Sequence, residues 1–393
     1  MFSPLRHFTS WTNWLIMLAI GVLVGIGIRS IWAEDPEHGA KQLLFAAIGL
    51  GALLMLQVVH YQAIGRVAWI LHIFALSAIL YTLLPFVHSS GFGGVPLVNG
   101  ARNWIDFKLL RFQPTELVKI TYVLTLAHYL RFRESQRSYA GLIPPFLLTV
   151  VPLLMILKQP DLGTSLVFVP CLFIMLFAAG ARMSHLLTVA GAGLLFVPLV
   201  WFAGNKGTPA FEHLPAVVKE YQRQRVYSMF SSDPGTLQKS GYQQHNALIA
   251  FGSGGFAGKG WGNIEIGHRV PESHNDMIFA LVGEQLGFLG VLVVLLAYGA
   301  LFLAGIETAG STRDPFGQLA AIGLTAMLAG GAFLNIMVVL KLMPVTGVTL
   351  PFISYGGSSL LANFVLAGLL MNIASRRPIV MGKSTFDGDG DFA

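Results

Sequence analysis

The stretch RVPESHNDMIF, residues 269–279, carries ionisable side chains immediately before a long apolar run. A carboxylate at the edge of an apolar region can serve as a general base toward a lipid-anchored substrate. Asp276 is the candidate for this role, with Glu272 and His274 beside it. Aspartate also caps helices well, and the local sequence leaves open whether Asp276 does more than begin a helix.

Ionisable residues also occur inside apolar runs, where a charge is costly and indicates either a paired partner or a function. In QPTELVKI, Glu116 and Lys119 are three residues apart and therefore share one face of a helix. They form either an ion pair that locks helix packing or a polar contact for a substrate. Glu284, which lies within the run that follows Asp276, belongs either to a packing pair or to a polar cavity.

Two further stretches have the composition of helix starts. In PFISYGGSS, residues 351–359, backbone N–H groups near Ser358 could bind an anion such as a diphosphate. Close helix packing through small residues explains the same stretch equally well. In KQPDLGTS, Asp161 follows Pro160 and is expected mainly to cap a helix.

The glycine-rich stretch GSGGFAGKG, residues 252–260, is not a nucleotide-binding P-loop. Five residues rather than four separate Gly252 from Gly258, and Gly260 stands where a P-loop requires Ser or Thr. We expect a flexible turn here, or a contact between Lys259 and a lipid phosphate.

Composition indicates that membrane helices carry these residues. The chain has 393 residues, of which 54% are hydrophobic and 11% charged, and its mean hydropathy is +0.66. Because a helix needs roughly 20 mostly apolar residues to cross the hydrocarbon core, we predict an all-α polytopic membrane protein. Ten spans are expected, at residues 12–31, 40–59, 66–87, 114–130, 142–158, 163–180, 184–204, 276–305, 317–341 and 351–375. The whole chain, 1–393, is predicted to be one membrane domain with a flexible tail at about 382–393.

Ten spans place both termini on the same side of the membrane. With the termini in the cytoplasm, the inner segments carry ten Lys and Arg residues and the short outer segments seven, as the positive-inside rule favours. A large loop at 205–275, between spans seven and eight, then lies outside the cell. Apolar positions at helical spacing within residues 214–230 predict a helix along the membrane surface, which carries Arg223 and Arg225.

Charge and cysteine content narrow the classes of partner. The net charge of +6 suits anionic lipid headgroups or phosphate-bearing substrates. Nucleic acid is the weaker interpretation, because the basic residues are dispersed among loops. Cys171 is the single cysteine, so neither an internal disulfide nor a cysteine-based metal site can form.

Taken in order, the hydrophilic stretches resemble the SEDS family (shape, elongation, division and sporulation), whose best known members are RodA and FtsW. The resemblance covers residues 40–375 and is carried by RNWIDFKLLRFQPTELVK, KQPDLGTSL, YQRQRV, GYQQHNALIAFGSGGFAGKGWG, PESHNDMIFALVGEQLGFLG and LPFISYGGSSLLANFVLAGLLMNI. Each motif is weak alone, and their common order makes the match specific.

The resemblance implies a ten-span peptidoglycan glycosyltransferase of the bacterial cytoplasmic membrane. Such an enzyme polymerises lipid II into glycan strands and works with a class B penicillin-binding protein. The family's essential acid falls on Asp276, and its charged pair falls on Glu116 and Lys119. The family usually has His-Thr-Asp-Phe where this chain has HNDM at 274–277, and two glutamates where this chain has EQ at 284–285.

The mechanism that we expect from this resemblance uses Asp276 as the base on the outer face. Asp276 would accept the proton of the acceptor sugar while undecaprenyl diphosphate leaves the donor. Cations must stabilise that leaving group, and Arg223, Arg225 and Lys259 are the candidates. Asp276 could instead hold Mg²⁺ or Mn²⁺ that bridges to the diphosphate. No nucleotide or organic cofactor is expected. The candidate substrate-binding residues are Glu116, Lys119, Arg223, Arg225, Lys259, His274 and Ser358.

Other functions stay open. Short cytoplasmic tails and KQPDLGTSL favour cell-wall elongation, and a role in division is the alternative. A lipid II flippase would need essential charges near the membrane midplane, whereas the candidates here concentrate at the outer rim. A scaffold that only recruits partners would function without Asp276.

Overall fold

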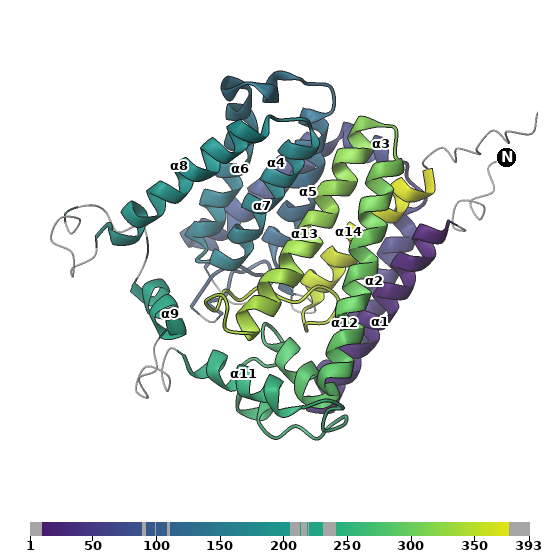
Figure 1. The fold of residues 1–393 in the computed structure, drawn as a ribbon, viewed down its shortest axis with the longest axis vertical. Helices are drawn as coiled ribbons and strands as arrows, with labels where there is room; N and C mark the ends of the chain where they lie inside the picture. Colours follow the sequence, from purple (N-terminus) through teal and green to yellow (C-terminus); the bar gives the residue numbers. More distant parts are fainter. Residues whose placement is uncertain are drawn as a thin grey trace, which may run out of the picture.

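The computed structural model describes residues 10–88, 92–98, 100–107, 111–204, 213, 218, 220–230 and 241–376, and these are largely helical (Figure 1). The helices are α1 Trp11–Glu34, α2 Pro36–Leu56, α3 Tyr61–Arg66, α4 Ala68–Leu83, α5 Pro114–Leu130, α6 Tyr139–Lys158, α7 Leu162–Ala178, α8 Met183–Phe202, α9 Glu220–Phe230, α11 Tyr242–Ser253, α12 Ile278–Ser311, α13 Pro315–Val339 and α14 Gly357–Arg376. Short 3-10 turns occupy Pro85–Val87, Ser135–Arg137 and Gly267–Arg269. A small antiparallel hairpin pairs β1, Ile105–Asp106, with β2, Arg111–Phe112. The tail expected at 382–393 lies outside the described residues.

The helices agree with the predicted all-α membrane architecture, while the number of crossings stays a prediction. Seven described helices are long and apolar enough to cross a membrane, namely α1, α2, α6, α8, α12, α13 and α14. Helices α4 and α7 are apolar but shorter, and α5 has 17 residues. The range 66–87, expected as one span, corresponds to α4, Ala68–Leu83, followed by the 3-10 turn Pro85–Val87.

The large loop expected at 205–275 contains two described helices, α9 and α11. The helix predicted over 214–230 begins at Glu220, and residues 214–217 and 219 lie outside the described part of the chain. Its placement on the membrane surface and the side of the membrane on which the loop lies stay predictions.

One residue joins α1 to α2, and its chemistry explains the sharp turn. Asp35 follows the end of α1 and caps α2, accepting a hydrogen bond from the backbone N–H of Glu37 at 2.8 Å. Pro36 occupies the first position of α2, where its missing N–H costs nothing. The turn therefore holds Glu34 and His38 together at one end of the helices.

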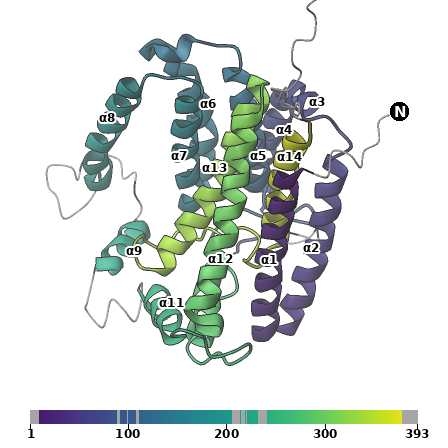
Figure 2. The ribbon, with the colours of Figure 1, turned by 45° about the vertical axis from the view of Figure 1, so that its right-hand side comes forward.

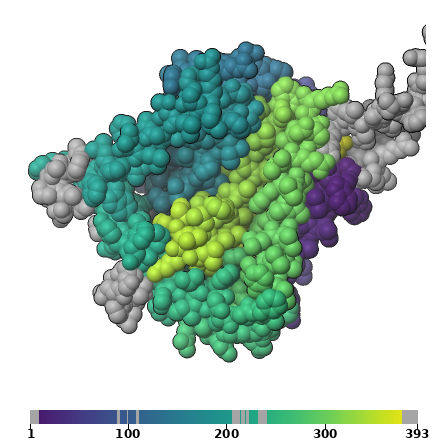
Figure 3. Space-filling model, viewed as in Figure 1, coloured from purple at the N-terminus to yellow at the C-terminus, as the bar shows by residue number. Residues whose placement is uncertain are grey.

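Helices α9 and α11 lie at the end of the helical bundle where α1 meets α2, and α3 lies at the other end (Figures 1 and 2). Helix α14 packs against α2 and α13 and is buried along most of its length. Helix α8 stands apart from the others, and Leu186 is the one buried residue among its 20. Figure 3 shows that the surface is hollowed between α8 and the yellow-green segment around the end of α13.

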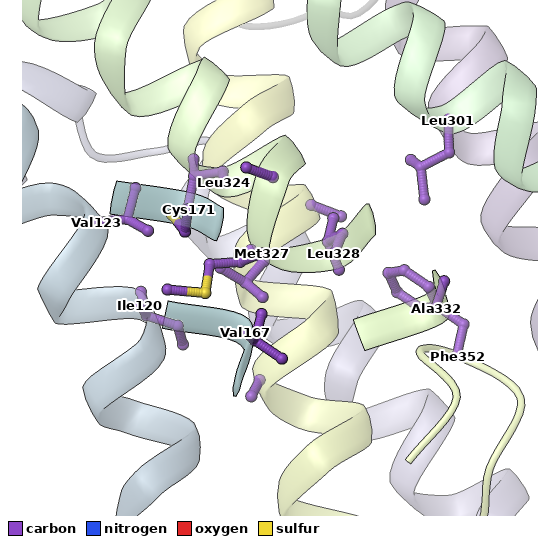
Figure 4. Packing of buried hydrophobic residues seen from close by; sticks show 14 of the residues in the cluster. Ile120, Val123, Val167, Cys171, Leu301, Leu324, Met327, Leu328, Ala332 and Phe352 are labelled. Atoms are coloured by element: carbon purple, nitrogen blue, oxygen red, sulfur yellow. The ribbon is translucent and has the colours of Figure 1, made fainter. Parts of the chain in front are cut away.

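The packed core is apolar where α5, α7 and α13 meet (Figure 4). Ile120 of α5, Cys171 of α7 and Met327 of α13 belong to this cluster. Cys171 is 0% exposed, and its Sγ lies 3.7 Å from the carbonyl oxygen of Gly323. A Cβ at Gly323 would meet a Val123 methyl carbon at 2.5 Å, so the glycine permits the close approach of α13 to α5.

Helix α12 is broken at Gly287, where the backbone leaves helical geometry (φ 63°, ψ −161°). The glycine-rich stretch at 252–260 fills the break. The backbone hydrogen bonds across it are Phe288 N–H to Gly255 O, Leu289 N–H to Phe256 O, Lys259 N–H to Glu284 O and Gly260 N–H to Gln285 O, at 2.9, 3.2, 3.0 and 3.0 Å. These bonds replace those that the broken helix lost. The stretch expected as a flexible turn thus fixes the first half of α12, which directly follows Asp276.

Candidate functional site

A cavity of about 980 Å³ collects residues from distant parts of the chain. Side chains of α2, α5, α7, α9, α13 and α14 contribute to it, together with the loops before α12 and α14. Its charged and titratable lining residues are His38, Lys41, Arg111, Glu116, Lys119, Asp161, Arg225, Glu272, His274, Asp276 and Tyr355. Phe45, Val167 and Met327 add apolar surface. The cavity can therefore receive a ligand with both charged and apolar parts.

Asp276 lines this cavity just before α12, and it does not cap that helix. The residue that precedes α12 is Met277, and no side chain caps the helix there. The Asp276 carboxylate accepts a hydrogen bond from Gln243 Nε2 at 3.3 Å. The Asp276 backbone carbonyl accepts one from Asn335 Nδ2 at 2.7 Å. The capping interpretation is therefore wrong, and the carboxylate is part of the cavity wall.

The surroundings of Asp276 make its carboxylate a stronger base than usual. Burial raises the pKa of Asp276 from 3.8 to about 6, and the negative charge of Glu272 acts in the same direction. The positive charge of Arg225 and the hydrogen bond from Gln243 oppose the rise in pKa. A carboxylate with a pKa near 6 is ionised at neutral pH and accepts a proton more readily than an ordinary one.

Glu116 and Lys119 form an ion pair in the first turns of α5. Lys119 Nζ lies 2.8 Å from Glu116 Oε2, and both side chains are largely buried. Asp161 lies on the same cavity, where it caps α7 by accepting a hydrogen bond from the Thr164 N–H at 2.9 Å. Gln113 Nε2 donates to the Asp161 carboxylate at 3.2 Å. The Glu116–Lys119 pair is thus both a packing contact within α5 and a part of the cavity wall. Its contact with a substrate stays a prediction.

His274 connects the segment before Asp276 to the turn between α1 and α2. Its ring stacks on that of His38 with centroids 4.8 Å apart, and its Nδ1 lies 3.8 Å from Glu34 Oε2. Its carbonyl oxygen accepts the backbone N–H of Tyr355 at 2.9 Å. The interaction with Glu34 raises the pKa of His274. His274, which is predicted to contact substrate, therefore also fixes the backbone next to Asp276.

The two arginines predicted to contact substrate have different surroundings. Arg225 lines the cavity, and its Nη1 donates to the carbonyl oxygen of Val345 at 3.1 Å. Arg223 is 3% exposed, and its Nη2 donates to the carbonyl oxygen of Ala203 at 2.7 Å. The structure thus brings Arg225 to Asp276 and leaves Arg223 outside the set of cavity-lining residues.

Lys259 and Glu284 pair with each other outside the cavity lining. Glu284 is 0% exposed, and its carboxylate accepts a hydrogen bond from Lys259 Nζ at 2.9 Å. The backbone N–H groups of Glu265, Ile266 and Gly267 donate to the same carboxylate at 3.0, 3.0 and 2.7 Å. Of the two interpretations of Glu284, the structure shows the packing pair. The predicted lipid-phosphate contact of Lys259 stays untested.

The start of α14 also lies at the cavity, but Ser358 does not line it. Gly356, Gly357 and Ser359 are lining residues, and Ser359 Oγ is 2.7 Å from Thr349 Oγ1. Ser358 is 3% exposed. Ser358 is thus not part of the cavity lining, and its contact with a substrate stays a prediction.

Sequence reasoning missed several residues of the site. Asn335 could have been found, because a polar side chain in an apolar helix indicates a buried partner. Lys41 and Arg111 are two of the seven basic residues assigned to the short outer segments, and a charge count alone does not connect them with the site. Gln243 and His38 gave no signal, because nothing in their local sequence tells which distant residue they contact.

A metal ion at Asp276 would not meet a preformed set of protein ligands in the described part of the chain. The described residues contain no group of three or more His, Cys, Asp or Glu side chains placed to hold a metal. One carboxylate, such as that of Asp276, is enough for Mg²⁺ or Mn²⁺ when the ion keeps most of its water and also binds substrate phosphates.

A family model of FtsW, RodA and SpoVE, described as "Cell cycle protein", matches residues 8–378. The chain belongs to this family. The resemblance read from the ordered motifs is confirmed, and the apolar helices are those of a multi-pass membrane protein.

Curated relatives align along nearly the whole chain. Stage V sporulation protein E of Bacillus subtilis is 35% identical over 371 residues, covering 92% of this chain and 94% of that protein. The probable peptidoglycan glycosyltransferase FtsW of Geobacter metallireducens is 32% identical over 370 residues, with 92% of each chain covered. The peptidoglycan glycosyltransferase MrdB of Escherichia coli K12 is 32% identical over 373 residues, with 94% of each covered.

Solved structures share the fold. A chain from a study of how a peptidoglycan synthase complex coordinates polymerization and crosslinking superposes with a TM-score of 0.76 at 29% identity, covering 93% of this chain and 98% of that one. The rod shape determining protein RodA of Thermus thermophilus gives a TM-score of 0.65 at 27% identity, covering 93% and 97%.

Proposed function

We propose that this chain is a peptidoglycan glycosyltransferase that polymerises lipid II into glycan strands during cell-wall elongation. Relatives named as peptidoglycan glycosyltransferases align over 92% and 94% of the chain. The observation that carries the proposal is the position of Asp276, a carboxylate of raised pKa that shares one cavity with Arg225 and the Glu116–Lys119 pair.

In the proposed reaction Asp276 is the general base. The 4-hydroxyl oxygen of the acceptor sugar attacks the anomeric carbon of the donor, and its proton passes to the carboxylate. The bond between the anomeric carbon and the diphosphate oxygen breaks, and undecaprenyl diphosphate takes the electron pair. Attack from the side opposite the leaving group inverts the anomeric centre.

Positive charge must stabilise the departing diphosphate. Arg225 is the predicted cation that lines the cavity, and Lys41 and Arg111 line it as well. Arg223 donates a hydrogen bond to the carbonyl oxygen of Ala203, and Lys259 pairs with Glu284, so we assign both residues structural roles. The mixed polar and apolar lining suits a substrate that carries sugar, diphosphate and lipid.

The alternative role of Asp276 is to hold Mg²⁺ or Mn²⁺ instead of accepting the proton, and the ion would then supply positive charge to the diphosphate. Titration of the polymerisation rate with a chelator tests this part of the proposal. Recovery of the rate on adding back either ion supports it, and a rate unaffected by the chelator contradicts it.

The decisive experiment follows polymerisation of fluorescent lipid II by the purified protein, with and without a class B penicillin-binding protein. The wild type is expected to yield glycan ladders, and Asp276→Ala to yield none while remaining folded. Asp314→Ala is a matched control, because Asp314 caps α13 by accepting the Gly317 N–H at 3.0 Å and does not line the cavity. The Asp314→Ala variant loses a helix cap, which costs about 1 kcal/mol of folding stability, and it is expected to keep its activity.

The other outcomes each point elsewhere. Ladders from folded Asp276→Ala would remove this residue from the chemistry. Absence of ladders from the wild type, with its partner present, would favour lipid II flipping or scaffolding over polymerisation.

The cellular setting is part of the same proposal. We place the protein in the bacterial cytoplasmic membrane, with cytoplasmic termini, the cavity toward the outer face and a class B penicillin-binding protein as partner. The similarity to a chain of a complex that coordinates polymerization and crosslinking supports that partner. The relatives include a sporulation protein and FtsW as well as MrdB, so depletion tests the role in elongation. Rounded cells are expected, and filaments would indicate division.

A further inference from the structure

Two buried polar side chains of the cavity have an atom without a hydrogen-bond partner in the described part of the chain. Asn103, which precedes β1, is 8% exposed, and its Oδ1 has no partner. Thr346, in the segment between α13 and α14, is 6% exposed, and its Oγ1 has none either. Both residues line the cavity. A buried polar atom that stays unpaired costs free energy, so these two atoms indicate a ligand that pairs with them.

The segment that carries Thr346 is tied both to the candidate cation and to the candidate base. Arg225 Nη1 donates to the backbone carbonyl oxygen of the residue before Thr346 at 3.1 Å. Asn335 Nδ2 donates to the carbonyl oxygens of Val348 and Asp276, in each case at 2.7 Å. The unpaired hydroxyl therefore belongs to a short stretch of backbone that is held to Arg225 on one side and to the backbone of Asp276 on the other.

A series of contacts connects the wall that carries Asn103 with the wall that carries Thr346. Asn103 leads into the hairpin of β1 and β2. Gln113, which follows β2, donates to the Asp161 carboxylate at 3.2 Å. Two residues after Asp161, a Cβ at Gly163 would lie 2.4 Å from the carbonyl oxygen of Thr346. The two unpaired groups thus lie on connected walls of the cavity, near the residues where α5 and α7 begin.

The chemistry of the two groups suits an uncharged part of a ligand. An amide and a hydroxyl form hydrogen bonds with neutral groups, whereas the diphosphate of the proposed substrate needs positive charge. A sugar carries hydroxyl and acetamido groups that can donate to Asn103 Oδ1 and pair with Thr346 Oγ1. In the proposed reaction the sugars must lie beside Asp276, and the segment of Thr346 is tied to the backbone of that residue.

We propose that Asn103 and Thr346 form a neutral subsite, which binds a sugar of the lipid-linked substrate through its hydroxyl and acetamido groups. The identity of this sugar rests on the proposed function. The proposal deepens that function, because it assigns recognition of the sugar to two residues that neither accept the proton nor stabilise the leaving diphosphate.

The test measures binding of two lipids to the full-length protein in detergent. Lipid II carries the sugars, and undecaprenyl diphosphate carries the same lipid and a diphosphate without them. Asn103→Leu and Thr346→Val keep the approximate size of the side chains and remove the hydrogen-bonding groups. We expect each variant to raise the Kd for lipid II about tenfold and to leave the Kd for undecaprenyl diphosphate unchanged. Thr346→Ser keeps the hydroxyl and should bind lipid II as the wild type does.

Thr125→Val is the matched control. Thr125 is buried in α5 outside the cavity lining, and its Oγ1 donates to the carbonyl oxygen of Ala68 at 3.1 Å. Because this hydroxyl has a protein partner, its loss should lower the Tm and leave the binding of both lipids unchanged. The Tm of Asn103→Leu and Thr346→Val should stay the same or rise, because the atoms removed there have no protein partner in the free protein.

Three results would overturn the proposal. They are unchanged binding of lipid II by both variants, an equal loss of binding for undecaprenyl diphosphate, and a fall in Tm as large as that of the control. If either variant does not fold, Asn103→Ala or Thr346→Ala removes the same polar atoms and is measured in the same way. If the wild type binds lipid II and makes no glycan, the proposed function fails, while the two Kd values still decide whether the subsite exists.

Discussion

At the scale of single residues, Asp276 is expected to cost the protein stability. Its pKa in the folded state, about 6, lies above its ordinary value of 3.8. Above pH 6 both the folded and the unfolded chain carry the charge, but the folded chain carries it in a poorly solvated place. The cost is therefore absent below pH 4, grows between pH 4 and pH 6, and is constant above.

Asp276→Asn removes this charge and should stabilise the protein. We expect a higher Tm than that of the wild type at pH 8, corresponding to at most about 3 kcal/mol, with a difference that disappears toward pH 4. Thermal unfolding in detergent at several pH values measures it. An Asp276→Asn protein that is less stable at pH 8 would contradict the assigned environment of the carboxylate.

The Glu116–Lys119 pair offers a second residue-scale prediction. Glu116→Gln or Lys119→Met alone leaves one buried charge without its partner, which typically costs about 3–5 kcal/mol. The double variant removes both charges and should regain much of the lost stability. A double-mutant cycle on Tm measures the coupling, and additive effects would contradict a direct pair.

Activity of the same double variant separates the two roles of the pair. If the pair only packs helices, stability and polymerisation recover together. If it also contacts substrate, as predicted from the family's charged pair, the stable double variant stays inactive.

The sequence predicts which residues belong to the site better than it predicts what their side chains contact. Asp276, Glu116 and Lys119 stood out because ionisable groups in apolar surroundings need a reason. The same reasoning did not predict that Lys259 pairs with Glu284, because their contact depends on how residues 252–260 pack at the break in α12. It could not find Gln243, because the contact of this glutamine with Asp276 forms only when α11 packs beside Pro271.

At the scale of elements, the break in α12 should depend on glycine. Gly287 has φ 63°, and a Cβ there would lie 2.3 Å from the backbone nitrogen of Gly258. Gly287→Ala must therefore displace the stretch at 252–260 from the break. We expect a loss of several kcal/mol and poor yield of folded protein.

Gly299 in the same helix is the control. A Cβ at Gly299 would meet nothing within 4 Å, so Gly299→Ala should be neutral or should stabilise the helix by up to about 1 kcal/mol. Parallel thermal unfolding of the two variants measures the contrast. Similar Tm values for both would show that the break tolerates a side chain.

The helices themselves were the most predictable elements. Long apolar runs give helices in a membrane because every backbone polar group must be satisfied within the segment. The break at Gly287 was not predicted, because residues 252–260, which are distant in sequence from the start of α12, supply the missing backbone hydrogen bonds there. A hydropathy profile carries no information on which backbone groups form hydrogen bonds with each other.

At the scale of the whole molecule, the cavity depends on the fold as a unit. It joins Lys41 near the start of the chain to Asn363 near its end. Sequence pattern gave both residues as parts of helices, and only the packing of α2 against α14 brings them to one wall. This is why the candidate base could be predicted and the shape of its surroundings could not.

Orientation in the membrane is testable on the same scale. With cytoplasmic termini, exposed His268 lies outside the cell and exposed Ser135 inside. We expect a membrane-impermeant maleimide to label His268→Cys on intact cells. Labelling of Ser135→Cys should require permeabilised cells, and the opposite pattern would reverse the proposed topology.

Such chemistry is favoured by Cys171, the chain's single thiol, which is 0% exposed in the core. Because Cys171 is buried, we expect a thiol reagent not to label the natural protein, so no cysteine-free variant has to be prepared. Fluorophores or spin labels on α8 and α13 could then follow the distance between these helices in lipid vesicles. The packing of α7 against α13 buries Cys171, so the measured signal would come from the introduced labels alone.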